Sequence, residues 1–256
     1  MTDPRTLADA LIHAERTRTP IAPLTRTHLF LDADTGYKVQ ALFVDHRLQA
    51  GEHLIGAKLG LTSRVKRQAL GIHEPVFGRL TSGMLLAPDQ PAPLDQLIGP
   101  RAEPEIAFII GRRLEGPVTT TGVLAATEAI VPAIEVMDSR YSDRFRLPDS
   151  VADNAGAARL ALGARPRTPS EVGDLRLVGC VFRSRGEVVD TAAGGAVLGD
   201  PAAAVAWLVN TLAARQEHLP AGSLVLSGGL TRSVALRPGG HAVAEFDALG
   251  SVGIYS

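Results

Sequence analysis

Residues 101–111 read Arg-Ala-Glu-Pro-Glu-Ile-Ala-Phe-Ile-Ile-Gly, and the second half of this stretch is rich in residues that favour β-strands. In a strand, side chains two positions apart share a face, so Glu103 and Glu105 would point one way and Ile106 the other. Two neighbouring carboxylates repel each other unless a cation or a proton lies between them. The stretch therefore predicts a strand that carries an unusual pair of acids on one face.

Most of the chain around and after this stretch has strand character. A hairpin is expected over residues 175–189, with Arg185 and Gly186 at its turn and β-branched residues on both arms. Further strand segments, separated by turns that contain glycine, are expected at residues 224–227, 234–236 and 243–255.

Helices are expected mainly in the first quarter of the chain. Asp3 followed by Pro4 is a typical helix start, and a second helix is expected over residues 34–49. A short helix is expected to begin near residue 63 and to end at Gly71. One later helix begins after Asp200, which is a good N-cap residue.

Helices that precede a series of strands are typical of an α+β protein rather than of a doubly wound sheet. We expect an N-terminal helical region at residues 1–90 that packs on a mixed-β catalytic core at residues 91–256. The proline-rich stretch at residues 88–100 is expected to be the surface loop that joins them. The simplest interpretation is one compact domain.

The composition narrows the class of protein. The 256 residues include 26 Lys+Arg and 27 Asp+Glu, and this near-neutral balance disfavours nucleic acid or an anionic membrane as partner. No apolar stretch reaches the roughly 18 residues of a membrane span. The single cysteine, Cys180, rules out an intrachain disulfide and a cysteine metal cluster. We therefore expect a cytoplasmic protein that acts on a small molecule.

A third acid stands out in the apolar run at residues 130–137, where Glu135 should be buried at a considerable cost. Three carboxylates without a nearby His or Cys suit a hard cation such as Mg²⁺ or Mn²⁺. The alternative is that Glu103 and Glu105 face solvent on an edge strand, while Glu135 pairs with an arginine.

Other polar residues next to apolar runs have two interpretations each. Lys58, between glycines and aliphatic residues, could carry a proton or polarise a carbonyl group, or it could extend outward to solvent. Asp138 and Arg140 could form a structural ion pair, and Asp153 with Asn154 could form a turn.

Several of these segments together resemble the 2-keto-4-pentenoate hydratase and 4-oxalocrotonate decarboxylase family of the fumarylacetoacetate hydrolase-like superfamily. The resemblance covers nearly the whole chain from about residue 37 onward. The segments that carry it, in order, are residues 56–63, 103–107, 135–140, 151–154 and 249–252.

The resemblance implies a mixed β-sheet roll or sandwich of the fumarylacetoacetate hydrolase C-terminal type, with an N-terminal helical layer. It also implies a divalent metal, Mg²⁺ or Mn²⁺, held by Glu103, Glu105 and Glu135. The implied substrate is a small 2-oxo acid or dicarboxylate. A homo-oligomer and a complex with the pathway hydratase are further expectations.

Two features favour the decarboxylase branch of this family. Hydratases resemble one another in an acid two residues before the glycine of a Pro-Asp-(Phe/Tyr)-Gly segment, and this chain has Val76 there. Residues 138–145 and 227–231 also look like the decarboxylase versions, and Arg159 fits that branch. One departure is that residues 156–158 are Gly-Ala-Ala, where the branch usually has serines.

The expected activity is metal-dependent decarboxylation of 4-oxalocrotonate to 2-hydroxypenta-2,4-dienoate and CO₂. Lys58 would hydrogen-bond the developing oxyanion, and Arg140 or Arg159 would position a carboxylate. Residues with a supporting or substrate-binding role are expected to be Asp153, Leu61 and Val76. The alternatives are a 2-hydroxypenta-2,4-dienoate hydratase and a non-catalytic partner of the hydratase.

Overall fold

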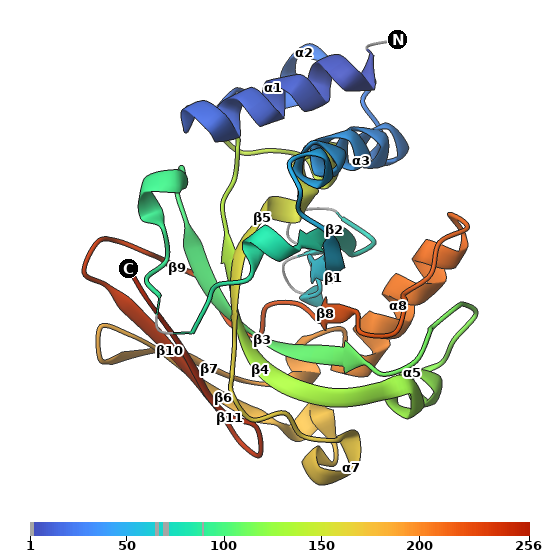
Figure 1. Cartoon of the computed structure of the whole chain (residues 1–256), viewed down its shortest axis with the longest axis vertical. Coiled ribbons are helices and arrows are strands. Elements are labelled where there is room, and N and C mark those ends of the chain that lie inside the picture. The colour runs from blue at the N-terminus through green and yellow to red at the C-terminus, as the bar shows by residue number, and fades with distance from the viewer. Residues whose placement is uncertain (1–2, 65–66, 69–71, 89) are drawn as a thin grey trace.

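The computed structural model describes residues 3–64, 67–68, 72–88 and 90–256. It contains a large curled sheet, a smaller second sheet packed against it, and a layer of helices on top (Figure 1). This arrangement confirms the α+β class and the mixed-sheet roll with an N-terminal helical layer. The helix expected to end at Gly71 falls largely outside the described residues.

The described helices are α1 Pro4–Thr17, α2 Leu24–Thr27, α3 Ala33–Gln49, α5 Thr120–Ala126, α6 Leu147–Ala152, α7 Pro169–Val172 and α8 Pro201–Ala213. The described strands are β1 Leu54–Gly60, β2 Val76–Thr81, β3 Arg101–Ile110, β4 Thr127–Met137, β5 Ala157–Leu162, β6 Gly179–Ser184, β7 Glu187–Ala193, β8 Leu224–Leu226, β9 Val234–Ala235, β10 His241–Phe246 and β11 Gly250–Tyr255.

The large sheet has the strand order β2-β1-β8-β3-β4-β5, with β9 also paired to β3. Among the strand pairs that the described residues form, the β1–β8 pair alone is parallel, so the sheet is mixed. The sheet curls into a roll, and as a result side chains from both of its ends and from its middle meet in one cluster. This interior cluster includes Leu80 of β2, Ala107 of β3 and Leu160 of β5.

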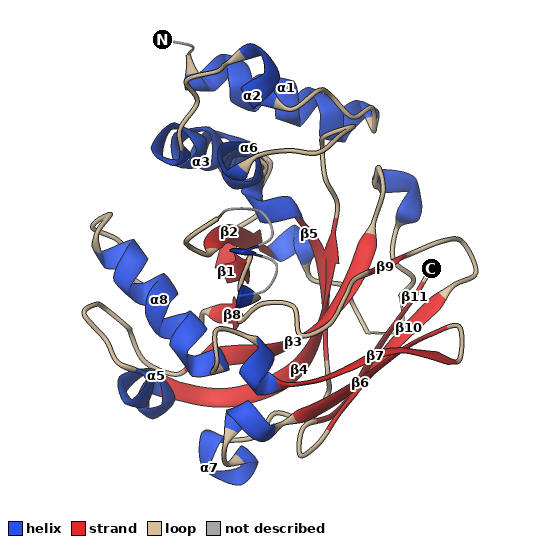
Figure 2. Ribbon diagram, turned by 180° about the vertical axis from the view of Figure 1, so that it is seen from behind, coloured by secondary structure: helices blue, strands red, loops and turns tan. Residues whose placement is uncertain are grey.

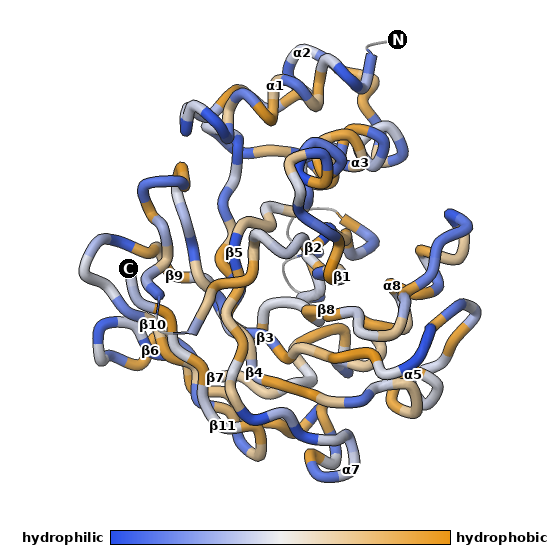
Figure 3. Tube along the Cα trace, in the orientation of Figure 1, coloured by the Kyte–Doolittle hydropathy of each residue, from blue (hydrophilic) through white to orange (hydrophobic). Residues whose placement is uncertain are grey.

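The outer face of the roll packs against the second sheet, whose order is β11-β10-β6-β7, and against helix α8. Ile106 and Val136 of the roll join Phe182 and Val252 of the second sheet in the main hydrophobic core. The view from behind shows α8 on the flank of the roll, with one end directed toward the helical layer (Figure 2). Hydrophobic residues follow β4 and the strands of the second sheet, whereas hydrophilic residues gather in the loops (Figure 3).

The helices begin where the sequence predicts. The Asp3 carboxylate accepts a hydrogen bond from the Arg5 amide at the start of α1, and the Asp200 carboxylate accepts one from the Ala202 amide at the start of α8. The hairpin turn at Arg185 and Gly186 is also present, but its strands run from residue 179 to 193 instead of 175 to 189.

The boundary of the helical layer differs from the expectation of a helical region at residues 1–90. The layer ends at Gln49, because β1 and β2 belong to the roll. Helix α6, from the middle of the chain, packs on α3 and completes the layer. The stretch at residues 88–100 therefore connects β2 to β3 within the roll, rather than a helical region to a β region.

One segment, Gly194–Ala213, is long and apolar enough to span a membrane by length and composition. Half of its most apolar window is buried in the structure. Val205, Leu208 and Leu212 of α8 lie in the core against the roll. Core packing therefore accounts for the apolar character of this segment.

Candidate metal centre

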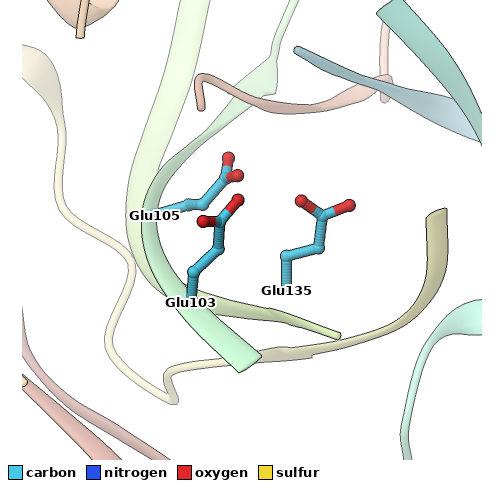
Figure 4. A group of neighbouring side chains, drawn as sticks. All are labelled: Glu103, Glu105 and Glu135. Atoms are coloured by element: carbon cyan, nitrogen blue, oxygen red, sulfur yellow. The ribbon is translucent and has the colours of Figure 1, made fainter. Parts of the chain in front are cut away.

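The three glutamates singled out in the sequence meet inside the roll. Glu103 and Glu105 lie on the same face of β3, and Glu135 lies directly opposite Glu103 on the antiparallel strand β4. Their carboxylates point into the same space (Figure 4). One carboxylate oxygen from each residue lies within 4.8 Å of the others. The period-two pattern of the strand therefore predicts this grouping correctly.

All three glutamates are buried, with exposed fractions of 7% for Glu103, 0% for Glu105 and 1% for Glu135. This overturns the alternative of solvent-facing acids on an edge strand, since β3 lies between β8 and β4. Glu105 Oε1 and Glu135 Oε1 have no hydrogen-bond partner among the described residues. Buried carboxylate oxygens without donors are costly, so something must compensate them.

Lys58 of β1 provides part of this compensation. It is 1% exposed, and its Nζ lies 3.0 Å from Glu135 Oε2 and 3.1 Å from the carbonyl oxygen of Ala155. The partner of Glu135 is therefore a lysine and not the arginine of the alternative interpretation. Burial acts to lower the pKa of Lys58, but Glu135, Glu105 and Glu103 outweigh it and raise that pKa above its usual value. Lys58 stays an ammonium ion.

Glu105 has the most unfavourable surroundings of the three acids. Burial, followed by the charges of Glu135 and Glu103, raises the pKa of the Glu105 carboxyl well above its usual value. Lys58 and the Gly228 amide act in the opposite direction, and the amide donates a 2.7 Å hydrogen bond to Glu105 Oε2. Without a cation, Glu105 therefore tends to hold a proton.

The group fits a divalent cation in charge and in chemistry. Three carboxylates and one ammonium leave a formal charge of −3 + 1 = −2, which a single divalent ion would balance. The donor atoms are all oxygens, which Mg²⁺ and Mn²⁺ prefer. Within the described residues, this is the group of acidic, His and Cys side chains that could hold a metal ion.

A glycine pair after β8 closes the cluster on one side. A Cβ atom at Gly229 would lie 2.4 Å from Glu103 Cδ, so only glycine allows this approach. Gly228 has φ +120° and a Cβ atom there would lie 2.2 Å from Thr62 Oγ1. The sequence indicates turn glycines here but not their contact with the glutamates, since that contact depends on how β8 pairs with β3.

Arg140 and Asp153 lie together as a buried ion pair, which we call the support, and neither side chain is open to solvent. Arg140 is 0% exposed, and its Nε lies 2.5 Å from Asp153 Oδ1. The guanidinium also donates to the backbone oxygens of Asp138 and Asp153 and lies over the ring of Phe43. The Arg140 guanidinium is therefore engaged by Asp153 and by two backbone oxygens, and its expected role in positioning a substrate carboxylate stays a prediction.

Burial raises the pKa of the Asp153 carboxyl to about 6, although Arg140 opposes this. The expected Asp138–Arg140 ion pair is replaced by other contacts. The Asp138 carboxylate accepts hydrogen bonds from the Ile98 and Gly99 amides, at 2.9 and 2.7 Å. Asp138 thereby fixes the loop that leads into β3.

The turn after Asp153 links this support to Lys58. Asn154 and Ala155 have φ values of 53° and 51°, which is unusual for two consecutive residues other than glycine. The Asn154 side chain is fully buried, accepts from the Arg79 amide at 2.7 Å and donates to the Arg79 carbonyl at 2.9 Å. The turn thereby directs the Ala155 carbonyl at the Lys58 ammonium.

Leu61 and Val76, expected to line the substrate, lie together in a small apolar cluster with Ala155. Val76 is 2% exposed and packs with Ala155, and Leu61 packs against this small cluster. A Cβ atom at Gly60 would contact Val76 Cγ2 at 3.0 Å and Lys58 Nζ at 3.8 Å. The position at which the hydratase segment has an acid is therefore occupied here by the apolar side chain of Val76, close to the Lys58 ammonium.

Arg159 does not join the glutamates. The β4–β5 register pairs Glu135 with Leu160 and Val136 with Arg159, so Arg159 points to the opposite face of the sheet. Its guanidinium donates to the Ala158 carbonyl and to Gln96 Oε1, in a surface cleft beside the helical layer.

The family model described as fumarylacetoacetate (FAA) hydrolase C-terminal matches residues 65–253. A 2-keto-4-pentenoate hydratase from Paraburkholderia xenovorans (strain LB400) is 40% identical over 247 residues, which are 96% of this chain and 91% of that protein. A 4-oxalocrotonate decarboxylase from Pseudomonas sp is 40% identical over 216 residues, covering 84% of this chain and 83% of that one.

Among solved structures, the 4-oxalocrotonate decarboxylase from Pseudomonas putida G7, complexed with magnesium and adipate, superposes with a TM-score of 0.94. It is 35% identical, and the match covers 98% of this chain and 96% of that chain. These likenesses extend over nearly the full length, including the helical layer, and confirm the resemblance seen in the sequence. The chain belongs to the fumarylacetoacetate hydrolase C-terminal family, in the group that contains 2-keto-4-pentenoate hydratases and 4-oxalocrotonate decarboxylases.

Proposed function

We propose that this protein is a lyase that depends on a divalent metal and decarboxylates 4-oxalocrotonate to 2-hydroxypenta-2,4-dienoate. The observation that carries the proposal is the buried cluster of three glutamates with one lysine, next to an apolar Val76. The relatives are named both as decarboxylases and as hydratases, so the choice between the two rests on the chemistry of the site.

Glu103, Glu105 and Glu135 would hold Mg²⁺ or Mn²⁺. Related decarboxylase structures are complexed with magnesium and with calcium. When bound, the ion would supply Lewis-acid stabilisation of negative charge on an oxygen of the 2-oxo acid. The glutamates contribute by neutralising the ion and by fixing it at the inner end of the site.

Lys58 would stabilise the charge that develops as CO₂ leaves. The electrons of the bond to the remote carboxylate move through the conjugated chain to the 2-oxygen, which then takes up a proton. An ammonium group has three N–H donors; one is donated to the Ala155 carbonyl, and Glu135 Oε2 forms an ion pair with the same nitrogen at 3.0 Å. A remaining donor is available for the substrate oxygen, where a positioned cation is worth most.

Val76 favours decarboxylation over hydration. Adding water to a C=C bond requires a group that carries a proton to or from carbon, whereas loss of CO₂ requires only an electron sink. Val76 is buried close to Lys58 and cannot carry a proton. The Gly-Ala-Ala sequence at residues 156–158, where the decarboxylase branch usually has serines, is the feature that counts against this choice.

A hydratase is the second candidate function, because a relative with that name is as similar as the decarboxylase. The test is to supply 4-oxalocrotonate and 2-hydroxypenta-2,4-dienoate separately, with Mg²⁺ or with EDTA. CO₂ release is then measured independently of the loss of diene absorbance. Metal-dependent CO₂ release supports the decarboxylase, whereas hydration without CO₂ release supports the hydratase.

The ligand assignment is tested in the same assay with Glu103→Gln, which should remove both metal binding and turnover. Glu128→Gln is the matched control, since it makes the same change at an exposed position on the strand that carries Glu135. Full turnover by Glu103→Gln would contradict the assignment. A protein that binds metal but turns over neither substrate would instead be a non-catalytic partner of a hydratase.

A further inference from the structure

A cleft of about 850 Å³ lies at the junction of the two sheets, and arginine dominates its lining. Arg101 at the start of β3 and Arg232 before β9 approach it from the roll. Arg185 at the β6–β7 turn and Arg237 before β10 approach it from the second sheet. All four arginines are exposed, and no carboxylate is among the residues that line the cleft.

Two of these guanidinium groups are held in place by neutral oxygens. Arg101 donates from Nε to Ser233 Oγ at 2.9 Å and from Nη2 to the Ser233 carbonyl at 2.7 Å. Arg232 donates from Nε and Nη2 to the Val189 carbonyl, at 3.2 and 2.7 Å. These bonds fix the orientation of both groups, but they leave their positive charge uncompensated and several N–H donors free.

The other two arginines have no carboxylate partner within the described part of the chain. Neither Arg185 nor Arg237 forms a side-chain hydrogen bond or an ion pair there. The contrast with Arg183 is informative, because it lies only two positions from Arg185 and pairs with Glu245 at 3.0 Å. The nearest acid to Arg185 along the chain is Glu187, which forms no ion pair with it among the described residues, and Asp190 accepts from the backbone amides of Arg232 and Thr191.

Four like charges in one cleft repel each other, in a protein whose net charge is −1. An anion would remove this repulsion, and guanidinium groups bind phosphate oxygens through paired N–H donors. The cleft has no aromatic side chain for a base to stack on, and its apolar lining is limited to Val189, Val234 and Ala235. Its chemistry therefore suits a chain of phosphate groups more than a nucleobase.

We propose that this cleft binds an oligophosphate, separately from the glutamate cluster. The lining includes none of the three glutamates and not Lys58, and its nearest approach to them along the chain is Arg101, two positions before Glu103 on β3. The cleft lies between the first residue of β3 in the roll and the β6–β7 turn of the second sheet, and a ligand carrying several phosphates would bridge the two.

The test is calorimetric titration of inorganic pyrophosphate into metal-free protein, so that neither metal nor substrate contributes. Pyrophosphate should bind at one site per chain, and the affinity should fall as NaCl is raised. The double variant Arg185→Gln and Arg237→Gln should weaken binding at least tenfold. The matched control, Arg112→Gln and Arg165→Gln, removes the same charge from two exposed arginines outside the cleft and should bind as the wild type does.

Three results would overturn the proposal: no binding, equal weakening in both double variants, or equally tight binding of adipate. The last would identify a dicarboxylate site instead. Sedimentation of the same samples provides a further test. If Arg185→Gln and Arg237→Gln change the mass of the particle, the cleft is a contact between copies of the chain and not an oligophosphate site.

Discussion

Lys58 is the residue on which the charge balance of the glutamate cluster depends. We predict that Lys58→Met destabilises the metal-free protein by about 3–5 kcal/mol, the usual cost of leaving a buried charge without its partner. Thermal or urea unfolding measures this. Lys38→Met is the control, because Lys38 is exposed and its loss should change the free energy of unfolding by less than about 0.5 kcal/mol. Equal effects of the two substitutions would contradict the account.

Gly229 provides a second test with a single-residue substitution. A methyl group there would overlap Glu103 Cδ, so Gly229→Ala should displace this carboxylate and weaken Mn²⁺ binding at least tenfold. Gly195→Ala is the control, because its nearest neighbour would be the Arg176 carbonyl at 3.5 Å, an ordinary contact. Calorimetric titration with Mn²⁺ distinguishes them, and unchanged affinity in Gly229→Ala would show that the glycine does not shape the site.

For individual residues, the sequence predicts which acids form the site, but it does not predict which residues the charged side chains pair with. Glu103, Glu105 and Glu135 stand out because carboxylates are rare in apolar strands. The partner of Glu135 is Lys58, which is 77 residues earlier in the chain, and that of Arg140 is Asp153. These pairs depend on which strands and turns become neighbours, and no local pattern contains that information. The same reason explains why Arg159 points away from the site.

Among the elements, the turn between α6 and β5 contributes most to the site. The Asn154 carboxamide forms two hydrogen bonds to the backbone of Arg79 while its own backbone is left-handed. We predict that Asn154→Ala destabilises the protein by about 3 kcal/mol, because it leaves two backbone groups without partners and puts Ala, which adopts the left-handed region less readily than Asn, at positive φ. Asn154→Gly should cost about 1 kcal/mol less, since glycine adopts this φ freely.

Asn210 makes the same pair of bonds to the backbone of Val118, but it is exposed. Water can replace its bonds, so Asn210→Ala should cost less than about 1 kcal/mol in urea unfolding. If Asn154→Ala is no more harmful than Asn210→Ala, the turn does not hold the site in the way that we describe.

Elements with strong local signals are predicted closely, and those defined by packing are not. Helix α8 begins at its predicted cap, and α3 begins within one residue of the expected position. The sequence places the first two strands of the roll in a helical region, because Gly56 and Gly60 give β1 a weak strand signal. Their strand character comes from pairing, with β1 joined to β2 on one side and to β8 on the other.

For the molecule as a whole, the helical layer and the roll share buried polar contacts. Gln40 of α3 donates to the Phe77 carbonyl in β2, and Asn154 beyond α6 bonds the backbone of Arg79 in β2. We therefore predict a single cooperative unfolding transition, as in one domain. Far-UV circular dichroism and the fluorescence of Trp207, the single tryptophan, should give the same urea midpoint. Separate midpoints would mean that the layer is an independent domain.

The central claim is that Glu103, Glu105 and Glu135 form a divalent metal centre. The most direct measurement is equilibrium binding of Mn²⁺ to metal-free wild type and to Glu105→Gln, the most deeply buried of the three. We predict one ion per wild-type chain and at least a hundredfold loss of affinity in the variant. Binding of Mn²⁺ to Glu105→Gln with wild-type affinity would contradict the claim.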